Sequence, residues 1–466
     1  MRRSLLSPIS IFILTVFLAL PERGEAESRE TLSEAAGWLQ SYLRIDTTNP
    51  PGNEYRGAAF LADVLHQEGI QTQLLVTPEG RTSLYARLEA KEAERTGKAL
   101  LLMHHIDVVP AGPGWKHPPF DGVVEDGTLW GRGAIDVKSL GVAQLTAFIE
   151  LKRSGLPLRR DVIYLAAADE ESGGGRGTRW LLEHHGELFD QVGVVLNEGG
   201  LNFTAAGNLL WWGLEVGQKR PLWLRVSAKG RAGHASSLNP HSASHKLILA
   251  LDRLLAMEPI YHVSDGARIY MEALAPLHGG KLGANMAQID EVIQPDGPTK
   301  MLMPGMSSLF LDTVQVTRLE ASDRINTIAK AATAEIDIRL LPDTDTEVFL
   351  GRIREALGAG VQVEVLLDAP PGSPSPFDTP LFELIKSQLS PEAPVVPAFI
   401  SGFTDSRYFR QRGIPAYGFS PFVLPSTQLK GIHASDEHIS LLEFDRGVQR
   451  LKKIVQTYAV LTLDGL

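Results

Sequence analysis

The stretch "ALLLMHHIDVVP", residues 99–110, predicts a buried strand that ends in polar groups. An apolar run is followed by His104, His105 and Asp107. A polar side chain loses hydration when it enters a core, so it needs a hydrogen-bond network or a metal ion as a partner. Because side chains alternate along a strand, His105 and Asp107 share one face and His104 points to the other. The rest of the chain must supply the partners.

Apolar segments of strand length alternate with helical segments on both sides of this stretch. The helical segments are 57–69, 142–155 and 178–189, and the further strands are 161–171 and 192–200. Continuous apolar strands between amphipathic helices are typical of an α/β sheet with helices on both faces. The pattern resumes after a proline-rich stretch at 369–380 and continues to a C-terminal helix at 444–460.

Between residues 217 and 370 the pattern changes to that of a second domain. Strand, helix, strand, strand, helix and strand follow one another, which is the order of the ferredoxin-like split unit. This order predicts a domain at 217–370 that is inserted into a first domain made of 30–216 and 371–466. Residues 258–311 show no clear periodicity, and a loop of that length is usually functional or flexible.

Composition excludes several classes of protein. The chain has 466 residues, of which 44% are hydrophobic, so it is globular and long enough for about two or three domains. Its formal charge is −10 and it has no basic stripe, which argues against a nucleic acid partner. It contains no cysteine, so no disulfide can form and any metal ion must be held by His, Asp and Glu.

The first residues predict a secretory signal peptide over 1–26. Arg2 and Arg3 precede an apolar run at 9–20, and residues 24–26 form a small-x-small cleavage candidate. We therefore expect a secreted protein or a periplasmic protein of the cell envelope. The alternative is an uncleaved membrane anchor, although the run is shorter than the roughly 20 residues of a spanning helix. No other segment is apolar enough to cross a bilayer.

Acidic and histidine clusters follow the ends of several predicted strands. They are "HHID" at 104–107, "GRGAIDVKS" at 131–139, "DEESGGG" at 169–175, "NEGG" at 197–200 and "GIHASDEHI" at 431–439. In α/β sheets, ligands gather outside the carboxyl ends of the strands, so these clusters can meet in one cleft. Each one alone has an ordinary explanation, such as a core histidine, an Asx turn or a solvated loop. Together they supply the side chains that Zn²⁺ and similar divalent cations bind.

These motifs resemble the set found in the di-zinc amidohydrolase and peptidase family of aminoacylase, acetylornithine deacetylase, succinyl-diaminopimelate desuccinylase and glutamate carboxypeptidase. The resemblance covers nearly the whole chain after the signal peptide. It implies a zinc-aminopeptidase-like catalytic domain, in which helices flank a mixed central sheet. It also implies that the inserted ferredoxin-like domain serves as a dimerisation or lid domain.

The resemblance further implies two zinc ions per subunit that share one carboxylate. Asp136 matches the bridging ligand. His105 and Glu198 would complete the first site, and Glu171 and His433 would complete the second. Carboxylate-rich sites also take Co²⁺ or Mn²⁺, so the native metal stays open.

The same motif distinguishes the two adjacent histidines. It places the metal ligand at His105, and Asp107 would support catalysis by accepting the free ring N–H of that histidine. His104 is then expected to pack or hydrogen-bond structurally.

Further matches concern catalysis and the substrate. Glu170 matches the general base, and His234 in "GRAGHASS" matches a histidine that reaches across a homodimer interface to the oxyanion. Asn326 and Arg339 in "RINTIAKAATAEIDIRLLP", and Gly402 in "SGFTDSRYF", match substrate-binding positions. A guanidinium suits a terminal carboxylate. His234 could also be an isolated histidine, and Arg339 an ordinary cation at a strand edge.

The resulting expectation is a metallo-hydrolase that cleaves the amide bond of small carboxylate-bearing substrates. A hydroxide held between the two ions would attack the carbonyl while Glu170 moves the proton. The substrate would be a short peptide cut at its C-terminal residue or, in the alternative, an N-acyl amino acid. Residues 258–311 resemble an insertion of the Gly-X carboxypeptidase and N-fatty-acyl amino acid hydrolase branch. A binding protein without catalysis is the alternative from another class, but every ligand position and the base are filled.

Overall fold

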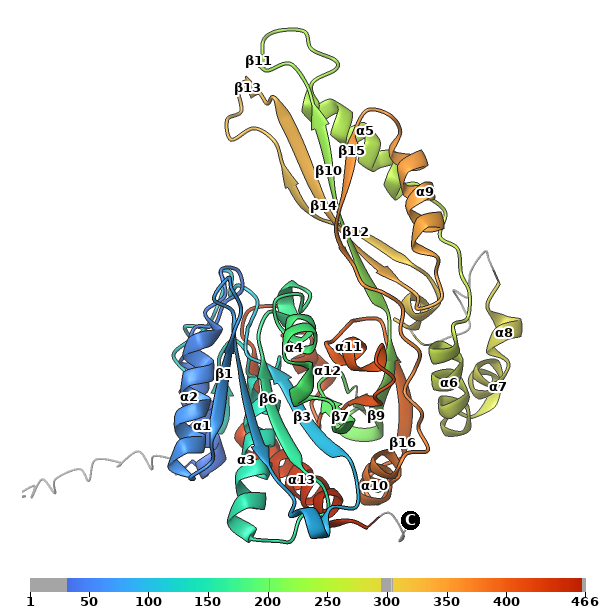
Figure 1. Cartoon of the computed structure of the whole chain (residues 1–466). Coiled ribbons are helices and arrows are strands. Elements are labelled where there is room, and N and C mark those ends of the chain that lie inside the picture. Colours follow the sequence, from blue (N-terminus) through green and yellow to red (C-terminus); the bar gives the residue numbers. More distant parts are fainter. Residues whose placement is uncertain (1–31, 201, 295–302, 304, 463–466) are drawn as a thin grey trace, which may run out of the picture. The chain divides into compact units, whose positions relative to one another are not determined.

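The stretch at 99–110 forms β3 (Ala99–His105), which lies inside a mixed nine-stranded sheet (Figure 1). The computed structural model describes residues 32–200, 202–294, 303 and 305–462. In their order across the sheet, the strands are β1 (Thr72–Val76), β2 (Thr82–Leu88), β6 (Val162–Ala167), β3, β7 (Val192–Asn197), β17 (Ala416–Gly418), β9 (Asn208–Gln218) and β16 (Val395–Ile400), with β8 (Phe203–Ala205) paired to β9. The neighbours β6, β3, β7 and β17 are parallel, whereas β1, β2 and β6 pair antiparallel.

Three smaller sheets accompany the main one. Their strands, in order across each sheet, are β12 (Thr313–Glu320), β14 (Ala331–Leu340), β10 (Arg220–Lys229) and β15 (Gln362–Asp368); β11 (Gly233–His234) and β13 (Thr327–Ile328); and β18 (His438–Ser440), β5 (Thr128–Trp130) and β4 (Val123–Glu125).

The described helices precede, separate and follow these strands along the chain. The α-helices are α1 (Glu34–Leu43), α2 (Glu54–Gln67), α3 (Lys138–Ser154), α4 (Thr178–His184), α5 (Ala243–Leu255), α6 (Asp265–Leu274), α7 (Gly280–Ala287), α8 (Ile289–Val292), α9 (Thr346–Leu357), α10 (Pro380–Leu389), α11 (Ser406–Arg410), α12 (Ser426–Leu429) and α13 (Leu441–Val460). Short 3₁₀ helices lie at Glu92–Glu94, Glu170–Ser172, Gly186–Leu188, Ala275–Leu277 and Met306–Phe310.

Helices cover both faces of the nine-stranded sheet. On one face, Leu101 of β3 packs in a buried cluster with Leu181 of α4 and Phe409 of α11. On the opposite face, the ring of His104 meets Gly141 of α3, and α3 in turn packs against α1 and α13. The α/β class with a mixed sheet flanked by helices is therefore confirmed.

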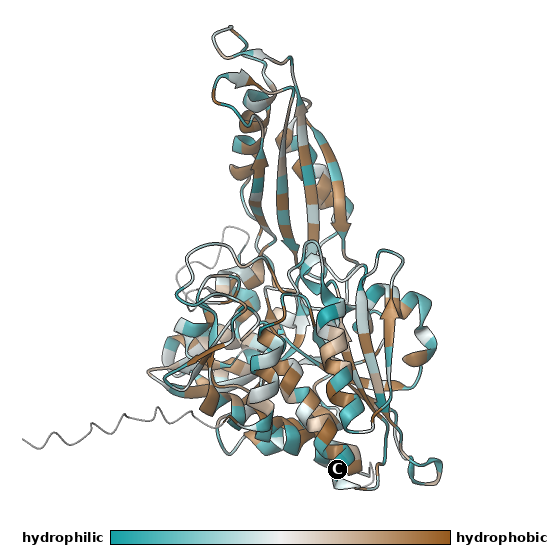
Figure 2. Cartoon of the chain, turned by 90° about the vertical axis from the view of Figure 1, so that its left-hand side faces the viewer, coloured by the Kyte–Doolittle hydropathy of each residue, from teal (hydrophilic) through white to brown (hydrophobic). Residues whose placement is uncertain are grey.

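The four-stranded sheet has the predicted strand and helix order. Its strands and two long helices follow the chain as β10, α5, β12, β14, α9 and β15, and all neighbouring strands are antiparallel. Alternate residues of β14 are buried, and Figure 2 shows hydrophobic and hydrophilic residues alternating along these strands. Ile336 and Ile338 of β14 pack with Leu251 of α5 and Ile353 of α9. One face of this sheet is thus covered by the two helices.

The stretch 258–311 differs from the expected loop, because it holds the helices α6 to α8. These helices have 10, 8 and 4 residues, so each spans too few turns to show a clear period in the sequence. Tyr270 and Met271 of α6 and Met286 of α7 pack with Val396 and Phe399 of β16. Part of the range predicted as the inserted domain, 217–370, therefore packs on the nine-stranded sheet.

The predicted signal peptide at 1–26 lies outside the described residues. The described residues from Ser33 onward form one compact unit. Among the described residues, no helix is both long and apolar enough to span a membrane.

Lys219 is the single residue between β9 and β10, and its side chain ties this junction to a neighbouring segment. The side chain is buried, and its Nζ donates to the carbonyl oxygens of Ser308 at 3.2 Å and Leu311 at 2.9 Å and to the hydroxyl of Thr313 at 3.2 Å. Burial lowers the pKa of Lys219 to about 8. One ammonium group thus joins the start of β10 to the chain that enters β12.

Replacing this ammonium should destabilise the protein. We expect Lys219→Met to lower the free energy of unfolding by about 2–4 kcal/mol at pH 7, because buried acceptors lose a charged donor. Lys246, whose Nζ donates to the carbonyl of Lys229 at the surface, is the matched control; Lys246→Met should change stability by less than about 0.5 kcal/mol. Chemical denaturation measures both. Equal effects of the two variants would contradict this role of Lys219.

The stability of the wild type and that of Lys219→Met should depend differently on pH. The folded-state pKa of Lys219, about 8, lies below its ordinary value of 10.5. Between these values the unfolded chain binds the proton and the folded chain does not, so the free energy of unfolding rises with pH. The stability of the wild type relative to Lys219→Met should therefore increase from pH 8 to pH 10.5. A constant difference over this range would contradict the lowered pKa.

Candidate metal centre

The strand ends bring the predicted metal ligands into one place. His105 ends β3, Glu171 lies in the 3₁₀ helix after β6, and Glu198 directly follows β7. Because β6, β3 and β7 are parallel neighbours, their carboxyl ends meet at one edge of the sheet. Asp136 precedes α3, and His433 lies in the loop before β18. Segments from both ends of the chain therefore contribute to one cluster.

Asp136 lies between two imidazoles. Its Oδ1 is 3.1 Å from Nε2 of His105, and its Oδ2 is 3.0 Å from Nε2 of His433. An oxygen of Glu198 is 3.6 Å from the same nitrogen of His105, and an oxygen of Glu171 is 3.4 Å from that of His433. The five predicted ligands thus form two groups that share the carboxylate of Asp136.

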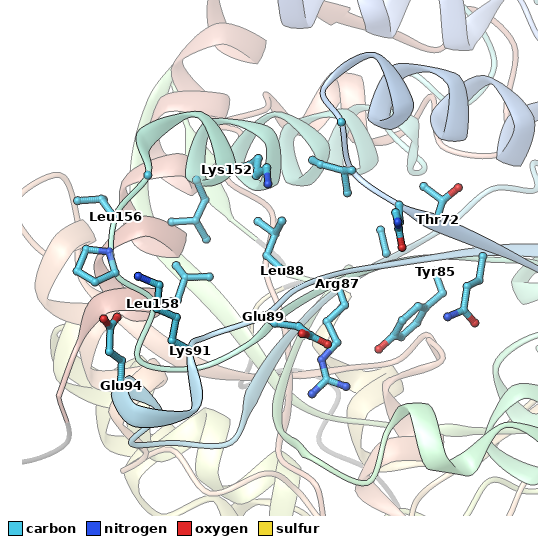
Figure 3. Close-up of a pocket in the computed structure, with 18 of the residues that line it drawn as sticks. Thr72, Tyr85, Arg87, Leu88, Glu89, Lys91, Glu94, Lys152, Leu156 and Leu158 are labelled. Atoms are coloured by element: carbon cyan, nitrogen blue, oxygen red, sulfur yellow. The ribbon is translucent and has the colours of Figure 1, made fainter.

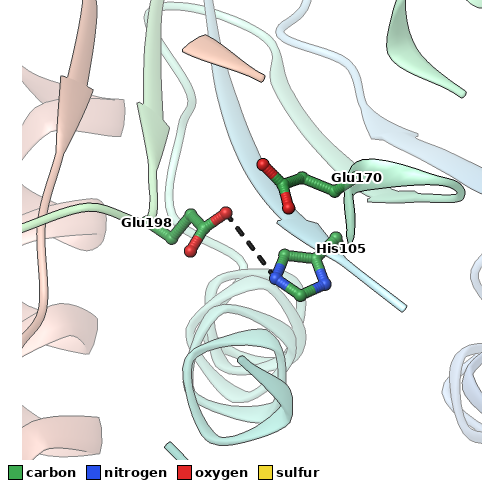
Figure 4. Close-up of side chains that lie close together, drawn as sticks. All are labelled: His105, Glu170 and Glu198. Atoms are coloured by element: carbon green, nitrogen blue, oxygen red, sulfur yellow. Dashed lines mark ion pairs between the residues drawn. The ribbon is translucent and has the colours of Figure 1, made fainter. Parts of the chain in front are cut away.

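Glu170 lies beside this arrangement, close to His105 and Glu198 (Figure 4). One donor atom from each of these three residues lies within 4.8 Å of the others, and so does one from each of His105, Asp136 and Glu171. Proximity alone therefore also fits Glu170 as a ligand. Among the described ion pairs, however, none joins Glu170 to a histidine, whereas each oxygen of Asp136 contacts a different one. We therefore group the candidate ligands into two sets that share Asp136, and we do not count Glu170 among them.

The cluster buries more negative charge than its own cations can balance. Glu170 is 6% exposed, and one carboxylate oxygen of Glu170 and one of Glu171 have no hydrogen-bond partner among the described residues. An ionised carboxylate is costly to bury unless a cation or hydrogen bonds compensate it. Four carboxylates face two imidazoles here. A nitrogen and oxygen donor set of this charge fits divalent cations such as Zn²⁺.

The pKa values of the cluster reflect the same crowding. Burial raises the pKa of Glu198 to about 8, and burial together with the charge of Glu198 raises the pKa of Glu170 well above its usual range. Hydrogen bonds to Asp136 and Glu171 raise the pKa of His433 to about 10. Burial opposes protonation of His105, but the charges of Glu198 and Asp136 outweigh it and raise its pKa. Protons and divalent cations therefore compete for this site.

Asp107 contacts the site in another way than predicted. Nδ1 of His105 lies 2.8 Å from the backbone carbonyl oxygen of Asp107 and 3.7 Å from its carboxylate, so the carbonyl accepts the ring N–H. The carboxylate instead accepts the backbone N–H groups of Glu170 at 3.2 Å and Glu171 at 3.1 Å, and the side-chain amide of Asn49 at 2.8 Å. Because β3 ends at His105, side-chain alternation does not extend to Asp107. Asp107 holds the turn of Glu170 and Glu171.

Glu437 holds the loop before α3, and no pattern in the sequence indicated this role. Its buried carboxylate accepts the backbone N–H groups of Gly133 at 2.9 Å, Ile135 at 2.7 Å and Asp136 at 2.9 Å. Arg132 pairs with the same carboxylate at 2.8 Å. The sequence showed only that Glu437 lies in the motif "GIHASDEHI", four residues after His433. Glu437 thus fixes the backbone that presents the shared carboxylate.

Arg339 lies next to the loop that carries Gly402. Its guanidinium is 4.4 Å from the ring centre of Phe403, and Gly402 itself is exposed. Nε and Nη2 of Arg339 each donate to the carboxylate of Asp337 at 2.7 Å. The structure therefore brings two predicted substrate positions together, although the arginine already has a carboxylate partner on its own strand.

His234 and Asn326 lie together in the ribbon of β11 and β13. The N–H of Ala235 donates to the carbonyl of Asn326 at 3.1 Å, and both His234 and Asn326 are exposed. No described hydrogen bond or ion pair joins either of them to the metal-ligand cluster. The predicted action of His234 requires a second subunit and stays a prediction.

His104 is buried on the other face of β3, as expected from the alternation of side chains. Its ring lies 5.4 Å from the ring of Tyr164 and 6.5 Å from that of Tyr42. Burial and the nearby His105 lower the pKa of His104 to about 3. The ring is therefore neutral and packs against aromatic side chains and α3.

A cleft of about 720 Å³ lies elsewhere, between β1, β2 and the end of α3 (Figure 3). Tyr85 and Arg87 of β2 and Lys152 and Leu156 near the end of α3 are among its lining residues. None of the predicted site residues lines it. This cleft and the predicted site residues therefore lie in different parts of the protein.

Comparisons with known proteins support the same chemistry. A model described as "Peptidase family M20/M25/M40" matches residues 101–457. Aminoacylase-1 of Homo sapiens is 26% identical over 433 residues, which cover 90% of this chain and 94% of that protein.

Solved structures share the fold. A metallo-carboxypeptidase of Sulfolobus solfataricus superposes with a TM-score of 0.70 at 18% identity, covering 92% of this chain and 100% of that one. Human carnosine dipeptidase 1 superposes with a TM-score of 0.71 at 16% identity, covering 92% of this chain and 97% of that one. At these identities the likeness concerns the fold alone.

The packing of His104 can be tested at Gly141. A Cβ atom there would lie 2.3 Å from the ring of His104, so we expect Gly141→Ala to lower the free energy of unfolding by about 1–3 kcal/mol. In a His104→Ala background the same change should cost at least about 1 kcal/mol less, because the ring is gone. Urea denaturation of the four proteins gives both costs. Equal costs in the two backgrounds would show that His104 does not limit the space at α3.

Proposed function

The chain belongs to the peptidase family M20/M25/M40, and on that premise we propose that it hydrolyses amide bonds of small substrates with two divalent cations per subunit. It is a metal-dependent hydrolase of peptide or amide bonds. The observation that carries the two-cation proposal is the carboxylate of Asp136, whose oxygens lie 3.1 Å and 3.0 Å from His105 and His433. A carboxylate placed in this way can serve two cations at once.

The cations would be held by the groups around Asp136, which are His105 and Glu198 on one side and Glu171 and His433 on the other. Zn²⁺ accepts such a set of imidazoles and carboxylates, and Co²⁺ or Mn²⁺ could replace it. Bound there, divalent cations would lower the pKa of a water molecule and polarise the scissile carbonyl.

Glu170 would act as the general base. It is buried, it lies beside His105 and Glu198, and Asp107 holds its backbone N–H. Burial raises its pKa above the usual range for a glutamate, and the positive charge of bound divalent cations would favour the ionised form that can accept a proton. Glu170 would take a proton from the attacking water and pass it to the leaving amine.

The substrate would carry a carboxylate next to the scissile amide. Arg339, beside Phe403 and Gly402, is the cation that we propose for its recognition. The similarity to aminoacylase-1 over 90% of this chain supports an N-acyl amino acid as the substrate. A short peptide cut at its C-terminal residue offers the same chemical groups, and it is the second candidate.

We also propose a homodimer and a location outside the cytoplasm. The predicted signal peptide at 1–26 supports secretion or a place in the cell envelope. The exposed position of His234 in the ribbon of β11 and β13 leaves it free to reach a second subunit. A catalytic role for His234 would require a dimer, because the ribbon and the ligand cluster share no described contact.

A hydrolysis screen tests the proposed activity. Purified protein should cleave N-acyl amino acids or dipeptides, and Glu170→Gln should lower kcat by about 10²–10⁴-fold, because the neutral amide keeps the shape but cannot take the proton. Elemental analysis should find two metal ions per subunit in both proteins. Full activity of Glu170→Gln would contradict its role as the base, and one ion per subunit would contradict the shared carboxylate.

Mixing two inactive variants tests the role of His234. We expect His234→Ala to lower kcat by about 10²–10³-fold, because an oxyanion donor is lost. In a mixed dimer of His234→Ala and Glu170→Gln, one site has both groups intact, so co-refolded subunits should regain up to about one quarter of the wild-type activity. No recovery, in mixtures that are shown to contain mixed dimers, would contradict the action of His234 across the subunit interface.

A further inference from the structure

Two arginine–aspartate pairs join β2 and β6 at opposite ends. The two strands are antiparallel neighbours. Arg81, just before β2, has Nη1 2.7 Å from Oδ1 of Asp169, just after β6. Arg87, near the end of β2, pairs with Asp161, just before β6. The two pairs are alike in chemistry, but the Arg81 pair lies at the end that carries the proposed base.

Asp169 organises the turn after β6. Its φ is +69°, a conformation that costs a residue other than glycine about 1–3 kcal/mol and persists only when the surroundings fix it. Its carboxylate accepts the backbone N–H of Arg176 at 2.8 Å, and its carbonyl accepts those of Ser172 at 3.2 Å and Gly174 at 2.7 Å. The turn 169–176 therefore closes on Asp169, and Glu170 and Glu171 directly follow Asp169 within it.

Arg81 is fixed from its other side by α2. Arg81 is 2% exposed and Glu54, the first residue of α2, is 1% exposed. Nε of Arg81 donates to the two carboxylate oxygens of Glu54 at 2.9 Å and 3.0 Å. Gly52 leaves the space that the guanidinium needs, because a Cβ there would lie 2.5 Å from Nε. The planar guanidinium thus bridges two buried carboxylates, a geometry that the single ammonium of lysine cannot reproduce.

A third carboxylate supports the same turn. The carboxylate of Asp107 accepts the backbone N–H groups of Glu170 and Glu171. The side-chain amide of Asn49 lies between the carboxylates of Asp107 and Asp169, at 2.8 Å from the first and 3.5 Å from the second. The turn is therefore held on the β3 side by Asp107 and on the β2 side by Arg81. In the described contacts, Arg81 touches neither Glu170 nor Glu171; the residue of their turn that it contacts directly is Asp169.

We propose that Arg81 is a positioning residue for the hydrolysis. By holding Asp169 in its left-handed conformation, it sets the directions in which Glu170 and Glu171 leave the turn. The inference rests on the proposed function, in which these residues are the base and a metal ligand. Groups that orient the residues of a metal site typically change activity or metal affinity by about 10–100-fold when they are removed. Small errors in the place of a catalytic group lower the rate strongly.

The two ends of the strand pair supply a matched experiment. We expect Arg81→Met to lower kcat by at least about 10-fold and to change KM by less than about 3-fold, at a temperature at which the variant is folded. Arg87→Met removes the corresponding cation from the distal end. Its melting temperature should fall less than that of Arg81→Met, because Asp161 keeps Arg95 as a partner at 2.9 Å, and its kcat should stay within about twofold of the wild type. Equal losses of kcat in the two variants would overturn the proposal.

A conservative variant decides the question if Arg81→Met does not fold. Arg81→Lys keeps the charge but cannot bridge both carboxylates, so its kcat should also fall by at least about 10-fold, and a wild-type kcat would overturn the proposal. In Arg81→Ala, added guanidinium ion at a non-denaturing concentration should restore part of kcat.

The control is Glu170→Gln. If that variant is inactive while Arg81→Lys is fully active, the positioning role fails and the proposed function stands; if Glu170→Gln is fully active, both fail.

Discussion

The site depends on compensating negative charge away from bulk water. Asp136, Glu170, Glu171 and Glu198 meet at the ends of three parallel strands, and the chain offers them two imidazoles. Carboxylates this close repel each other unless protons or divalent cations lie among them. The raised pKa of Glu198 and the raised pKa of His433 both express this constraint. The fold must therefore hold these side chains rigidly, because repulsion between the carboxylates would otherwise move them apart when no cation is bound.

Rigidity comes from carboxylates that bind the backbone. Asp107 accepts the N–H groups of Glu170 and Glu171, and Glu437 accepts those of Gly133, Ile135 and Asp136. In both places a buried side chain from a distant segment satisfies main-chain donors that would otherwise be costly to bury. The proposed ligands and base thus take their directions from loops whose main chain is itself hydrogen-bonded. Arg81 acts at a greater distance from the reacting atoms, because it contacts Asp169, the residue before Glu170.

The elements and the ligand types were predictable because their signals are local. Apolar runs mark β3, β6 and β7, and the polar residues at their ends stand next to these runs in the sequence. The partner of the His105 ring was not predictable, because it depends on where β3 stops. Glu437 was missed because its hydrogen-bond partners lie more than 300 residues earlier in the chain. The helices α6 to α8 gave no clear period, since each of them spans only a few turns.

The strand order also bears on synthesis of the chain on the ribosome. β1, β2, β6, β3 and β7 are successive neighbours in the sheet, and all of them end by residue 197, so they can pair as soon as that residue is available. β17, at Ala416–Gly418, inserts between β7 and β9, which are both synthesised more than 190 residues earlier. Until β17 arrives, β7 is an open edge with unpaired main-chain groups, a template for pairing with another chain. A nascent or truncated chain that ends before residue 416 therefore carries an aggregation risk that the complete sheet removes.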